Sequence, residues 1–568
     1  MASDYPKMYQ MHSYSRCRLL GGSFCLFDFK IAPSQPQENR LSFDRSRLNR
    51  MFCIPPDQHP STEGLRLLRE ELHKRNISVM VLQHQCEQPG SSLSSKLLFW
   101  IFLFAYVLFV LGSTWSHLKS IRKSESESWW VYEFSLIRTV PKLWKNKPGS
   151  DFRRLSALQG VRVLTTCLVV FWHTLFCLST MFLRDVNQLE QNFQQPLVFY
   201  LVFMGAFAVQ IFFLMSTLLL TNQVLELRGR HGRISARHCW ILVLNRIFRF
   251  LPTLAVAIAA TRSGVYERTP HAIKLMNMCS ENCGKNWWYS LLQITILLDF
   301  NQICNPIFWY LSVDTLYYLF TLFMLYSLQD FDFNALKVFG FLIFASIAGF
   351  AWYLYVNEYH FLYQPYPEPF KNLLESQEIN VVYCPPLASW TSSLVGAALG
   401  YFYYHHKGDK NFTINSVATL LFWSGCAAVP TITLHLSTLT YKGPTAALMG
   451  AILKPLFVLP LGLGLVAMAF GMGGPLKTIL ESRFLLITGN VTYCTYVFHS
   501  VIVFAKGLFQ EELIDYLNSH LIFWVVTDLV GSFALGTVTT VLLEYPGIEL
   551  QRRILPQIGT SERKLKKN

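Results

Sequence analysis

Two ionisable side chains lie within one long apolar stretch of this chain. Arg162 and His173 are eleven residues apart in GVRVLTTCLVVFWHTLFCLSTMF, a segment long enough to cross a bilayer as a helix. Eleven residues are close to three helical turns, so both side chains lie on one helical face, roughly 16 Å apart along the axis. A charged Arg at membrane depth costs at least about 2.5 kcal/mol on insertion scales. Such a group faces a cavity or a partner rather than lipid, so this span is the first candidate for a functional site.

A second span carries two more arginines. In NRIFRFLP, Arg246 and Arg249 lie one turn apart on a shared helical face, and Pro252 bends the helix just beyond them. Guanidinium groups bind phosphate oxygens bidentately, so the pair suits a phosphate-rich ligand. The alternative interpretation is that both arginines only extend toward the membrane surface from a helix end. The sequence leaves both interpretations open.

Asp314 and His499 complete the set of candidate site residues. Asp314 lies in NPIFWYLSVDTLYYLF, and His499 lies past the midpoint of NVTYCTYVFHSVIVF. We expect the two imidazoles, of His499 and His173, to share the outer half of the bundle with the Asp314 carboxylate, and the three arginines to share the inner half. In the alternative, each His is hydrogen-bonded to a neighbouring helix, and Asp314 pairs with Lys454.

Other patterns carry less information about chemistry. The chain has no P-loop, no G-x-S-x-G elbow and no convincing spacing of metal ligands, so no metal and no bound cofactor are expected. The run from Gly462 to Ala467 imitates a dinucleotide fingerprint, but it lies in an apolar span with no strand before it. Gly396 and Gly400, four residues apart, predict close packing of two helices.

These residues belong to an integral membrane protein. The chain has 568 residues, of which 52% are hydrophobic and only 15% charged, and 45 are Phe. The predicted fold class is all-α, a polytopic bundle of about eleven transmembrane helices that comprises a ten-helix core and one N-terminal span. The predicted spans are 97–114, 160–182, 196–220, 238–260, 307–327, 336–355, 387–404, 413–436, 446–471, 484–507 and 520–543. A shorter apolar segment at 287–300, beside Cys283 and Cys304, is predicted to be an interfacial or lumenal helix.

The distribution of basic residues predicts the orientation. With residues 115–158 placed in the cytosol, the cytosolic loops and tail carry 24 Lys and Arg residues, and the opposite loops carry 7. This positive-inside pattern places the N-terminal segment outside the cytosol and the C-terminal tail inside it. The net charge of +14 is divided by the membrane, so a nucleic-acid partner is not expected. The predicted divisions are an N-terminal cysteine-containing segment, a first span, a basic cytosolic linker, a transmembrane domain and a basic tail, at 1–96, 97–114, 115–158, 159–545 and 546–568.

The predicted topology assigns the thirteen cysteines either to the non-cytosolic side of the membrane or to the spans. Four precede the first span, four lie in loops opposite the cytosol, five lie inside spans, and no cytosolic loop contains one. Even numbers in each outward group predict disulfides formed in an oxidising compartment, with the pairing left open. A glycosylation sequon at Asn76 lies on the same side. No secretory signal peptide is recognisable, so either the first span is a reverse anchor or the N-terminus is incomplete. The outward cysteines are Cys17, Cys25, Cys53 and Cys86 before the first span, and Cys279, Cys283, Cys304 and Cys384 in the loops.

The sequence from about residue 150 to the end resembles the membrane acyltransferase 3 family, in particular its animal branch of nose resistant to fluoxetine proteins. The similarity is carried by the Arg162-x10-His173 pair after DFRRLSALQG, by Arg246-x-x-Arg249 with Pro252, and by four later segments. Residues 17–90 resemble a shortened version of the cysteine-containing outward domain of that branch. The chain departs from the branch at Ser389, where arginine is frequent, and at Ser500, where proline is common. The later segments are CxxxC with KNWWYSLLQI, FWYLSVDTLYYL, TYCTYVFHS and EYPGIEL.

The resemblance implies transfer of an acyl group from acyl-CoA, the donor substrate, to a hydroxyl of a lipid, glycan or other acceptor. On that interpretation His173 is the general base, and a positioned base is typically worth ~10²–10⁴-fold in rate. Arg246 and Arg249 would bind the phosphates of CoA, and Arg162 would orient the donor or stabilise oxyanion charge. Asp314 and His499 would support the reaction.

Two other classes of function stay open at this point. The same buried ionisable groups would suit a transporter of lipids or small hydrophobic molecules, which would move its cargo without consuming a thioester. A purely structural or receptor-like role is less favoured because it leaves the buried charges unexplained. The sequence predicts a multi-pass protein of the endoplasmic reticulum or the plasma membrane. It names neither the acceptor, the acyl length nor the oligomeric state.

Overall fold

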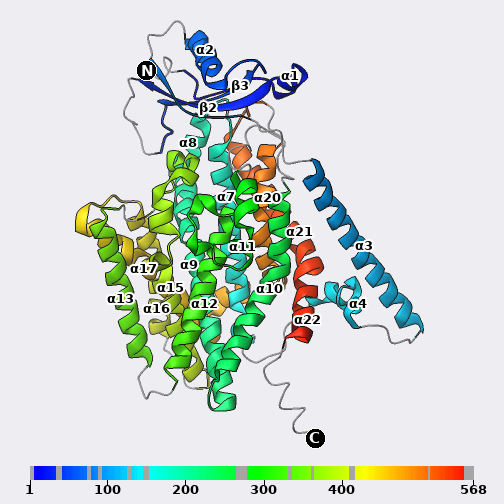
Figure 1. Cartoon of the computed structure of the whole chain (residues 1–568). Coiled ribbons are helices and arrows are strands. Elements are labelled where there is room, and N and C mark those ends of the chain that lie inside the picture. Colours follow the sequence, from blue (N-terminus) through cyan, green and yellow to red (C-terminus); the bar gives the residue numbers. More distant parts are fainter. Residues whose placement is uncertain are drawn as a thin grey trace.

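A computed structural model gives the fold of the chain. Its long helices stand side by side in one bundle, with a small β-sheet at one end (Figure 1). We call the end that carries the sheet the sheet face, and the opposite end, where α9 turns into α10, the basic face. The structure describes residues 6–32, 41–72, 78–86, 93–123, 129–144, 153–263, 278–329, 335–359, 362, 364–408, 416–508 and 512–555. The sequon at Asn76, parts of the basic linker and most of the basic tail lie outside these residues.

Each of the eleven predicted spans coincides with a helix or with a pair of consecutive helices. Within the described residues, nine helices are long and apolar enough to cross a membrane, and one bent pair could form a tenth span. The predicted class, a polytopic helix bundle, is therefore confirmed, although the exact number of spans is not. The long helices are α3 (Leu93–Lys123), α7 (Ala157–Thr180), α9 (Pro196–His231), α10 (Ala236–Arg262), α12 (Trp309–Ser327), α13 (Ala335–Val356), α15 (Pro386–His406), α16 (Ser416–Ser437), α17 (Gly443–Ala469), α20 (Thr492–Leu508) and α21 (Asn518–Thr539).

Helix α15 is the predicted span that is not among these strongly apolar helices, because it contains several Ser, Tyr and His residues, and it is packed inside the protein. It lies against α9 and α17, and most of its residues are buried. A Cβ atom on Gly396 would overlap the backbone of Leu214 in α9, and one on Gly400 would overlap Leu218 one turn further along. The close helix packing predicted from these two glycines is therefore confirmed.

Two predicted segments differ from the observed helices. The span predicted at 484–507 is a pair of helices, α19 (Arg483–Gly489) and α20, that meet at an angle of 73°. The side chain of Asn490 at this bend donates a hydrogen bond to the carbonyl of Leu143 over 3.2 Å. The interfacial helix predicted at 287–300 begins earlier, as α11 (Met278–Leu291), and residues 295–302 form two short 3-10 turns instead.

The N-terminal segment folds as a four-stranded sheet, which the sequence did not predict. Its order is β1-β3-β2-β4, with β1 parallel to β3 and the other pairs antiparallel. Helix α2 packs on β3 and β4 over a core of phenylalanines and aliphatic side chains. The elements are β1 (Tyr9–Met11), α1 (Tyr14–Leu19), β2 (Ser23–Ala32), β3 (Arg47–Ile54), α2 (Pro60–Leu72) and β4 (Ser78–Cys86).

Disulfides join the cysteines of this sheet, as the even number of outward cysteines predicted. Cys17 in α1 is bonded to Cys53 in β3, and Cys25 in β2 is bonded to Cys86 in β4. In the loops only one of the two possible pairs forms, between Cys283 and Cys304. The other two loop cysteines, Cys279 and Cys384, are free thiols.

The sheet is fixed to the end of the bundle by polar and apolar contacts. Glu190, in α8 (Asn187–Gln194), accepts a hydrogen bond from the backbone N–H of Phe43 at 2.7 Å and forms an ion pair with Arg45 at 2.8 Å. The rings of Tyr9 and Phe182 lie 4.8 Å apart, centre to centre. These contacts make the sheet part of the same hydrophobic core as the helix ends beneath it.

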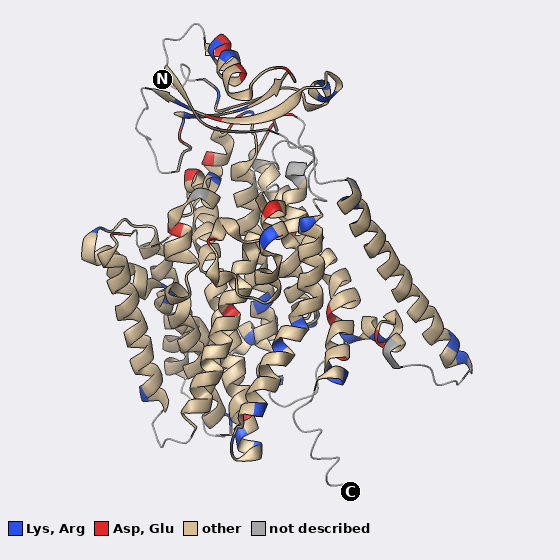
Figure 2. Ribbon diagram, viewed as in Figure 1, with Lys and Arg blue, Asp and Glu red and all other residues tan. Residues whose placement is uncertain are grey.

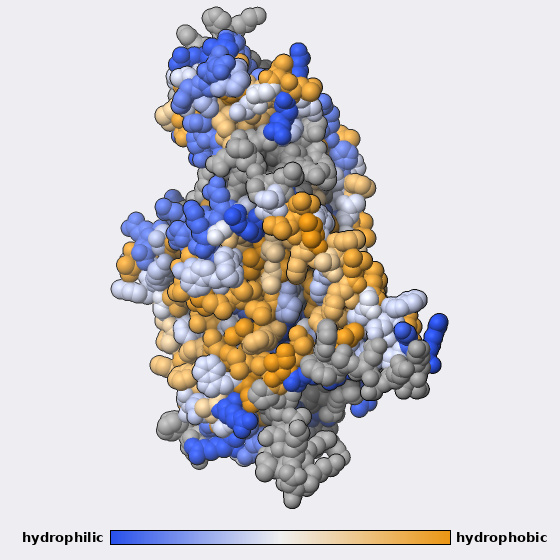
Figure 3. Space-filling view, turned by 45° about the vertical axis from the view of Figure 1, so that its right-hand side comes forward, coloured by the Kyte–Doolittle hydropathy of each residue, from blue (hydrophilic) through white to orange (hydrophobic). Residues whose placement is uncertain are grey.

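The surface of the bundle has the pattern of a protein that lies in a membrane. Hydrophobic residues form a broad band around the middle, and hydrophilic residues gather toward the two ends (Figure 3). Lys and Arg gather at the basic face, where α9 ends and α10 begins (Figure 2). Helix α3 stands at the edge of the bundle (Figure 1). Only 11% of its most apolar stretch is buried, so most of its surface would face lipid.

The remaining short elements connect these helices. Two ion pairs join α22 to the short helices that follow α3. Arg553 of α22 pairs with the buried Glu133 of α4 at 2.7 Å, and Glu549 of α22 pairs with Lys142 of η1 at 2.9 Å. The remaining elements are α4 (Trp129–Glu133), α5 (Leu136–Thr139), η1 (Val140–Leu143), η3 (Thr295–Leu297), η4 (Phe300–Gln302), η5 (Pro306–Phe308), α14 (Pro367–Lys371), η6 (Leu373–Glu375), η7 (Ile379–Tyr383), α18 (Gly474–Leu480), η8 (Thr540–Glu544) and α22 (Tyr545–Ile554).

Candidate active site

A cavity opens in the half of the bundle nearer the sheet face, and His173 lines it. Its walls come from α7, α9, α10, α11, α12 and α20 and from the segments around η5, η6 and η7. The centre of a water-sized molecule can move in about 80 Å³ of this space, which is room for several waters. The lining is mainly aromatic and aliphatic, and its aromatic members are Trp172, Phe176, Phe300, Trp309, Tyr383, Tyr496 and Phe504.

The hydrogen bond of His173 leaves one ring nitrogen available. Its Nδ1 lies 2.8 Å from the carbonyl oxygen of Val169, one turn earlier in α7. A carbonyl oxygen can only accept a hydrogen bond, so Nδ1 carries the hydrogen and Nε2 carries the lone pair of the neutral ring. A neutral imidazole with a free Nε2 beside a cavity is the arrangement that a general base needs.

The structure brings His499 next to His173, as the sequence predicted. The two ring centres are 4.7 Å apart and the rings meet edge to face at 67°. Nδ1 of His499 lies 2.6 Å from the carbonyl of Tyr496, so its tautomer is fixed in the same way. Its Nε2 is buried without a hydrogen-bond partner in the described part of the chain. Two imidazoles therefore present lone pairs to one small region.

The three predicted arginines lie deeper, toward the basic face, and two of them pair with buried carboxylates. Arg246 forms an ion pair with Asp314, and its guanidinium also lies 4.4 Å from the centre of the Tyr318 ring. Arg249 pairs with Glu544 at 2.9 Å. We call the two ion pairs, Arg246–Asp314 and Arg249–Glu544, together with Arg162 the arginine cluster.

One expectation about this region was wrong. Asp314 was expected to share the outer half of the bundle with the two imidazoles, and its alternative partner was Lys454. It pairs instead with Arg246, while the ammonium of Lys454 donates to two backbone carbonyls, those of Val382 and Ala388, at 3.3 and 2.9 Å. Asp314 therefore belongs to the arginine cluster, because the helix α12 that carries it packs on α10.

Arg162 is the cation of this cluster that no carboxylate neutralises. Within the described residues its guanidinium makes no hydrogen bond or ion pair, although Arg249, Tyr310 and Asp314 lie within electrostatic range. The cluster thus holds three guanidinium groups and two carboxylates, which leaves one positive charge. An anionic group would compensate it.

Two carboxylates in the spans were not singled out from the sequence. Glu544 is almost fully buried beside Arg249, and its second oxygen lies 3.5 Å from the thiol of Cys494. Asp528 accepts a hydrogen bond at 2.6 Å from Thr174, the neighbour of His173. The signal was available, because an acid within an apolar stretch of this length is itself unusual.

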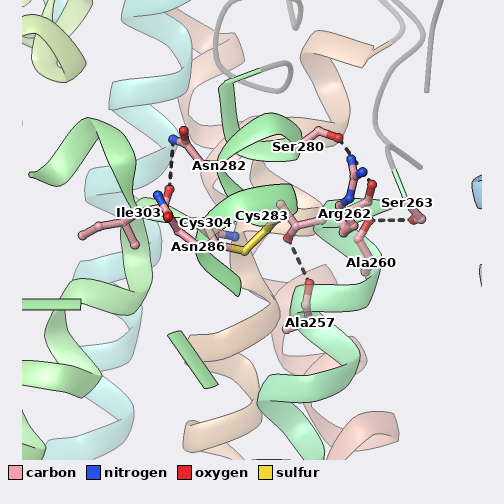
Figure 4. Close-up of a disulfide and its surroundings, with 12 residues drawn as sticks. Ala257, Ala260, Arg262, Ser263, Ser280, Asn282, Cys283, Asn286, Ile303 and Cys304 are labelled. Carbon is pink, nitrogen blue, oxygen red and sulfur yellow. Dashed lines mark hydrogen bonds between the residues drawn. A yellow bond between two sulfur atoms is a disulfide. The ribbon is translucent and has the colours of Figure 1, made fainter. Parts of the chain in front are cut away.

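A disulfide holds part of the cavity wall in place. Cys283 in α11 is bonded to Cys304, just before the segment 305–307 that lines the cavity (Figure 4). Asn282 donates from its side chain to the carbonyl of Asn301 at 2.6 Å, and Asn286 donates to the carbonyl of Gln302 at 3.0 Å. These bonds fix the loop between η4 and α12 against α11.

A free thiol also lines the cavity. Burial raises the pKa of the Cys279 thiol to about 12. The thiol is therefore protonated at neutral pH, and Cys279 is not a candidate nucleophile.

Ser389 and Ser500, the positions at which the chain departs from the nose resistant to fluoxetine pattern, have different surroundings. Ser389 accepts a hydrogen bond from the amide of Gln210 at 2.8 Å, and Ser392 donates to the same amide at 2.9 Å. Ser389 is thus part of a buried polar contact between α9 and α15. Ser500, the residue after His499 in α20, lines the cavity.

A model of the acyltransferase domain (Acyl_transf_3) matches residues 155–546, which is more than half of the chain. The chain belongs to the acyltransferase 3 family. The matched residues include the whole arginine cluster and both His173 and His499. The family is that of membrane acyltransferases, and it is the one indicated by the Arg162-x10-His173 and Arg246-x-x-Arg249 patterns.

One relative shares part of this sequence. Nose resistant to fluoxetine protein 6 of Caenorhabditis elegans is 20% identical over 441 residues, which cover 73% of this chain and 53% of that protein. The chain thus spans about half the length of this relative. No solved structure matches the chain.

Proposed function

We propose that this protein transfers an acyl group from acyl-CoA to a hydroxyl group of an acceptor bound in the cavity. The observation that carries the proposal is the position of His173. It lines a cavity with its Nε2 free, and three turns toward the basic face on the same helix lies Arg162, whose guanidinium pairs with no carboxylate in the part of the chain that the structure describes.

In the proposed reaction His173 acts as general base. Its Nε2 removes the proton from the acceptor hydroxyl while the hydroxyl oxygen attacks the thioester carbonyl. The new O–C bond forms, the C–S bond breaks, and the proton passes from the imidazolium to the departing thiolate of CoA. The Nδ1 hydrogen bond to Val169 keeps the ring in the tautomer that this step requires.

His499 has a supporting role in this proposal. Its unpartnered Nε2 lies close enough to accept a hydrogen bond when His173 becomes protonated, because the ring centres are 4.7 Å apart. The pair would then hold the transferred proton between them until the thiolate takes it.

The arginine cluster is the proposed donor site. Arg162 supplies the uncompensated charge, and Arg249 adds a guanidinium that is 46% exposed, so both can bind phosphate oxygens. Arg246 is only 15% exposed and is neutralised by Asp314, so we assign this pair to holding α10 and α12 together rather than to direct donor binding.

The orientation follows from this assignment. We propose that the basic face lies in the cytosol, where acyl-CoA is made, and that the sheet face lies on the opposite side. The disulfides of the sheet support this, because they form in oxidising compartments. The protein would therefore be an enzyme of the endoplasmic reticulum or the plasma membrane.

The test is release of free CoA by the purified full chain in liposomes. The liposomes receive labelled acyl-CoA and a mixture of a membrane-lipid extract and soluble glycans. We expect release that falls at least 100-fold in His173→Ala, because a positioned base is worth ~10²–10⁴-fold. His435→Ala is the matched control, since His435 is exposed on α16 and its ring is hydrogen-bonded to Tyr200, away from the cavity lining.

The outcomes separate the two open classes of function. Release that disappears only in His173→Ala, with both variants eluting as folded protein, supports the transferase. Release that is the same in all three proteins removes His173 from the reaction. Movement of a labelled lipid across the liposome membrane without any CoA release would favour transport instead.

A further inference from the structure

The lining of the cavity restricts the kind of acceptor that it can take. Among the residues that line it, none is Asp, Glu, Lys or Arg, and His173 is the one imidazole. Aromatic and aliphatic side chains together form most of the wall. Trp172 and Phe176 lie nearly parallel, at 16°, and Phe504 meets Phe176 edge to face with ring centres 6.1 Å apart.

Three of the polar lining groups are already engaged with the backbone. The hydroxyl of Tyr496 donates to the carbonyl of Ile307 at 2.9 Å, and that of Tyr383 donates to the carbonyl of Ala206 at 3.1 Å. Thr261 donates to Ala257 at 2.9 Å. The indole N–H of Trp172 is buried without a partner in the described part of the chain, and Asn305 and Ser500 add further polar atoms to the lining. These few groups cannot pair every hydroxyl of a polyhydroxylated ligand, and burying each unpaired hydroxyl is costly.

The depth of His173 in the cavity indicates how a ligand would be oriented there. His173 lies seven residues before the end of α7 at the sheet face, which corresponds to about 10 Å of helix. Between this level and the helix end the wall contains apolar residues such as Phe176, Val501 and Phe504, together with Thr261 near the end of α10. A ligand that reaches His173 thus places its hydroxyl beside the imidazole and its body largely against apolar side chains.

We propose that the acceptor is an apolar alcohol, a molecule with a single hydroxyl on a hydrocarbon body, which enters hydroxyl first. This inference rests on the proposed function and narrows its acceptor to lipid alcohols in place of glycans. The reaction forms an ester: the alcohol oxygen bonds to the acyl carbon, the thioester C–S bond breaks, and the alcohol proton goes through His173 Nε2 to the thiolate.

The experiment compares acceptors in one preparation. The full chain in liposomes receives radiolabelled acetyl-, octanoyl- or palmitoyl-CoA together with farnesol, dodecanol or cholesterol in one arm and with N-acetylglucosamine, glucose or glycerol in the other. Labelled ester is measured after extraction into organic and aqueous phases. We expect His173-dependent ester with at least one apolar alcohol, formed at least tenfold faster than with any polyhydroxylated acceptor.

A wall variant tests whether the cavity is where the alcohol binds. Phe504→Ala removes one apolar side chain that α20 contributes to the cavity wall. The KM for the apolar alcohol should rise several-fold, while the KM for acyl-CoA stays unchanged. Phe344→Ala is the matched control, because Phe344 in α13 is 69% exposed and far from the lining. Elution of each variant as a single folded species is checked first.

The possible failures are distinct. His173-dependent ester formed equally well or better on a sugar or glycerol would overturn the apolar acceptor and leave the transferase standing. Equal KM values for the alcohol in native protein and Phe504→Ala would place the acceptor elsewhere. Absence of His173-dependent CoA release in both arms, with the lipid extract also present, would refute the transferase and the acceptor together.

Discussion

The ion pair between Arg249 and Glu544 predicts an asymmetry between two substitutions. The two side chains meet at 2.9 Å, but Arg249 is 46% exposed and Glu544 only 2%. Opposite charges about 4 Å apart attract by roughly 4 kcal/mol at the effective dielectric constant near a protein surface. Arg249 lies within a membrane span, so its exposed surface does not face bulk water, and the cost depends on which hydrogen-bonding group each substitution leaves.

The expected magnitudes follow from that difference. Arg249→Met leaves a buried carboxylate unpaired and should lower the free energy of unfolding by about 3–5 kcal/mol. Glu544→Gln keeps an amide oxygen that can still accept the hydrogen bond from Arg249, and should cost about 1–2 kcal/mol. The double variant Arg249→Met with Glu544→Leu removes both charges and should return to within about 1 kcal/mol of the native chain.

The measurement is unfolding of the purified protein in mixed micelles with an increasing fraction of SDS, followed by tryptophan fluorescence. Arg552→Met is the control, because Arg552 is 58% exposed and its pair with Glu549 should contribute less than about 1 kcal/mol. If Glu544→Gln proved as costly as Arg249→Met, or if the double variant were as unstable as the two single variants summed, the buried carboxylate would not be what stabilises this contact.

Three further predictions concern other parts of the chain. Arg162→Met should weaken CoA binding about tenfold or more, because one charge-assisted contact is worth about 1.5–3 kcal/mol; unchanged affinity in a titration would place the donor elsewhere. Gly396→Ala should destabilise the bundle by about 1–3 kcal/mol through overlap with α9, whereas Gly425→Ala, with open space around it, should not; equal thermal midpoints would contradict the close packing. Burial lowers the pKa of His12, whose Nδ1 accepts a hydrogen bond from the N–H of Cys53. The unfolded state therefore binds more protons, and the stability of the sheet should be full above pH 6.5 and fall as the pH drops below it; exchange of β3 amides that is independent of pH after correction for intrinsic rates would refute this.

The spans could be predicted from the sequence because the membrane imposes a length and a composition on each of them. All eleven predicted ranges coincide with helices, and the errors lie at ends and bends, such as the 73° break after α19. The bend depends on contacts with Leu143 and other residues distant in sequence, and no local pattern reports such contacts. The sheet of the N-terminal segment was missed for the same reason, since β1 is only three residues long and its partner β3 lies nearly forty residues away.

The residues of the site could be predicted, but their partners could not. Periodicity placed Arg162 and His173 on one face of one helix, and the imidazoles of His173 and His499 lie together as expected. Which acid meets which arginine depends on the neighbours of α10 in space. The structure places α12 and η8 there, and these bring Asp314 to Arg246 and Glu544 to Arg249.

The pairing of the buried charges explains why Arg162 carries the donor proposal. Four of the cations inside the spans were visible in the sequence, and two of them meet carboxylates in the described structure, Arg246 and Arg249. Lys454 meets no carboxylate, but two carbonyl oxygens at 2.9 and 3.3 Å accept hydrogen bonds from its ammonium group. Arg162 has neither kind of partner among the described residues. A guanidinium held at membrane depth without compensation is costly, so its retention on the helix of His173 is best explained by an anionic ligand that binds there during the reaction.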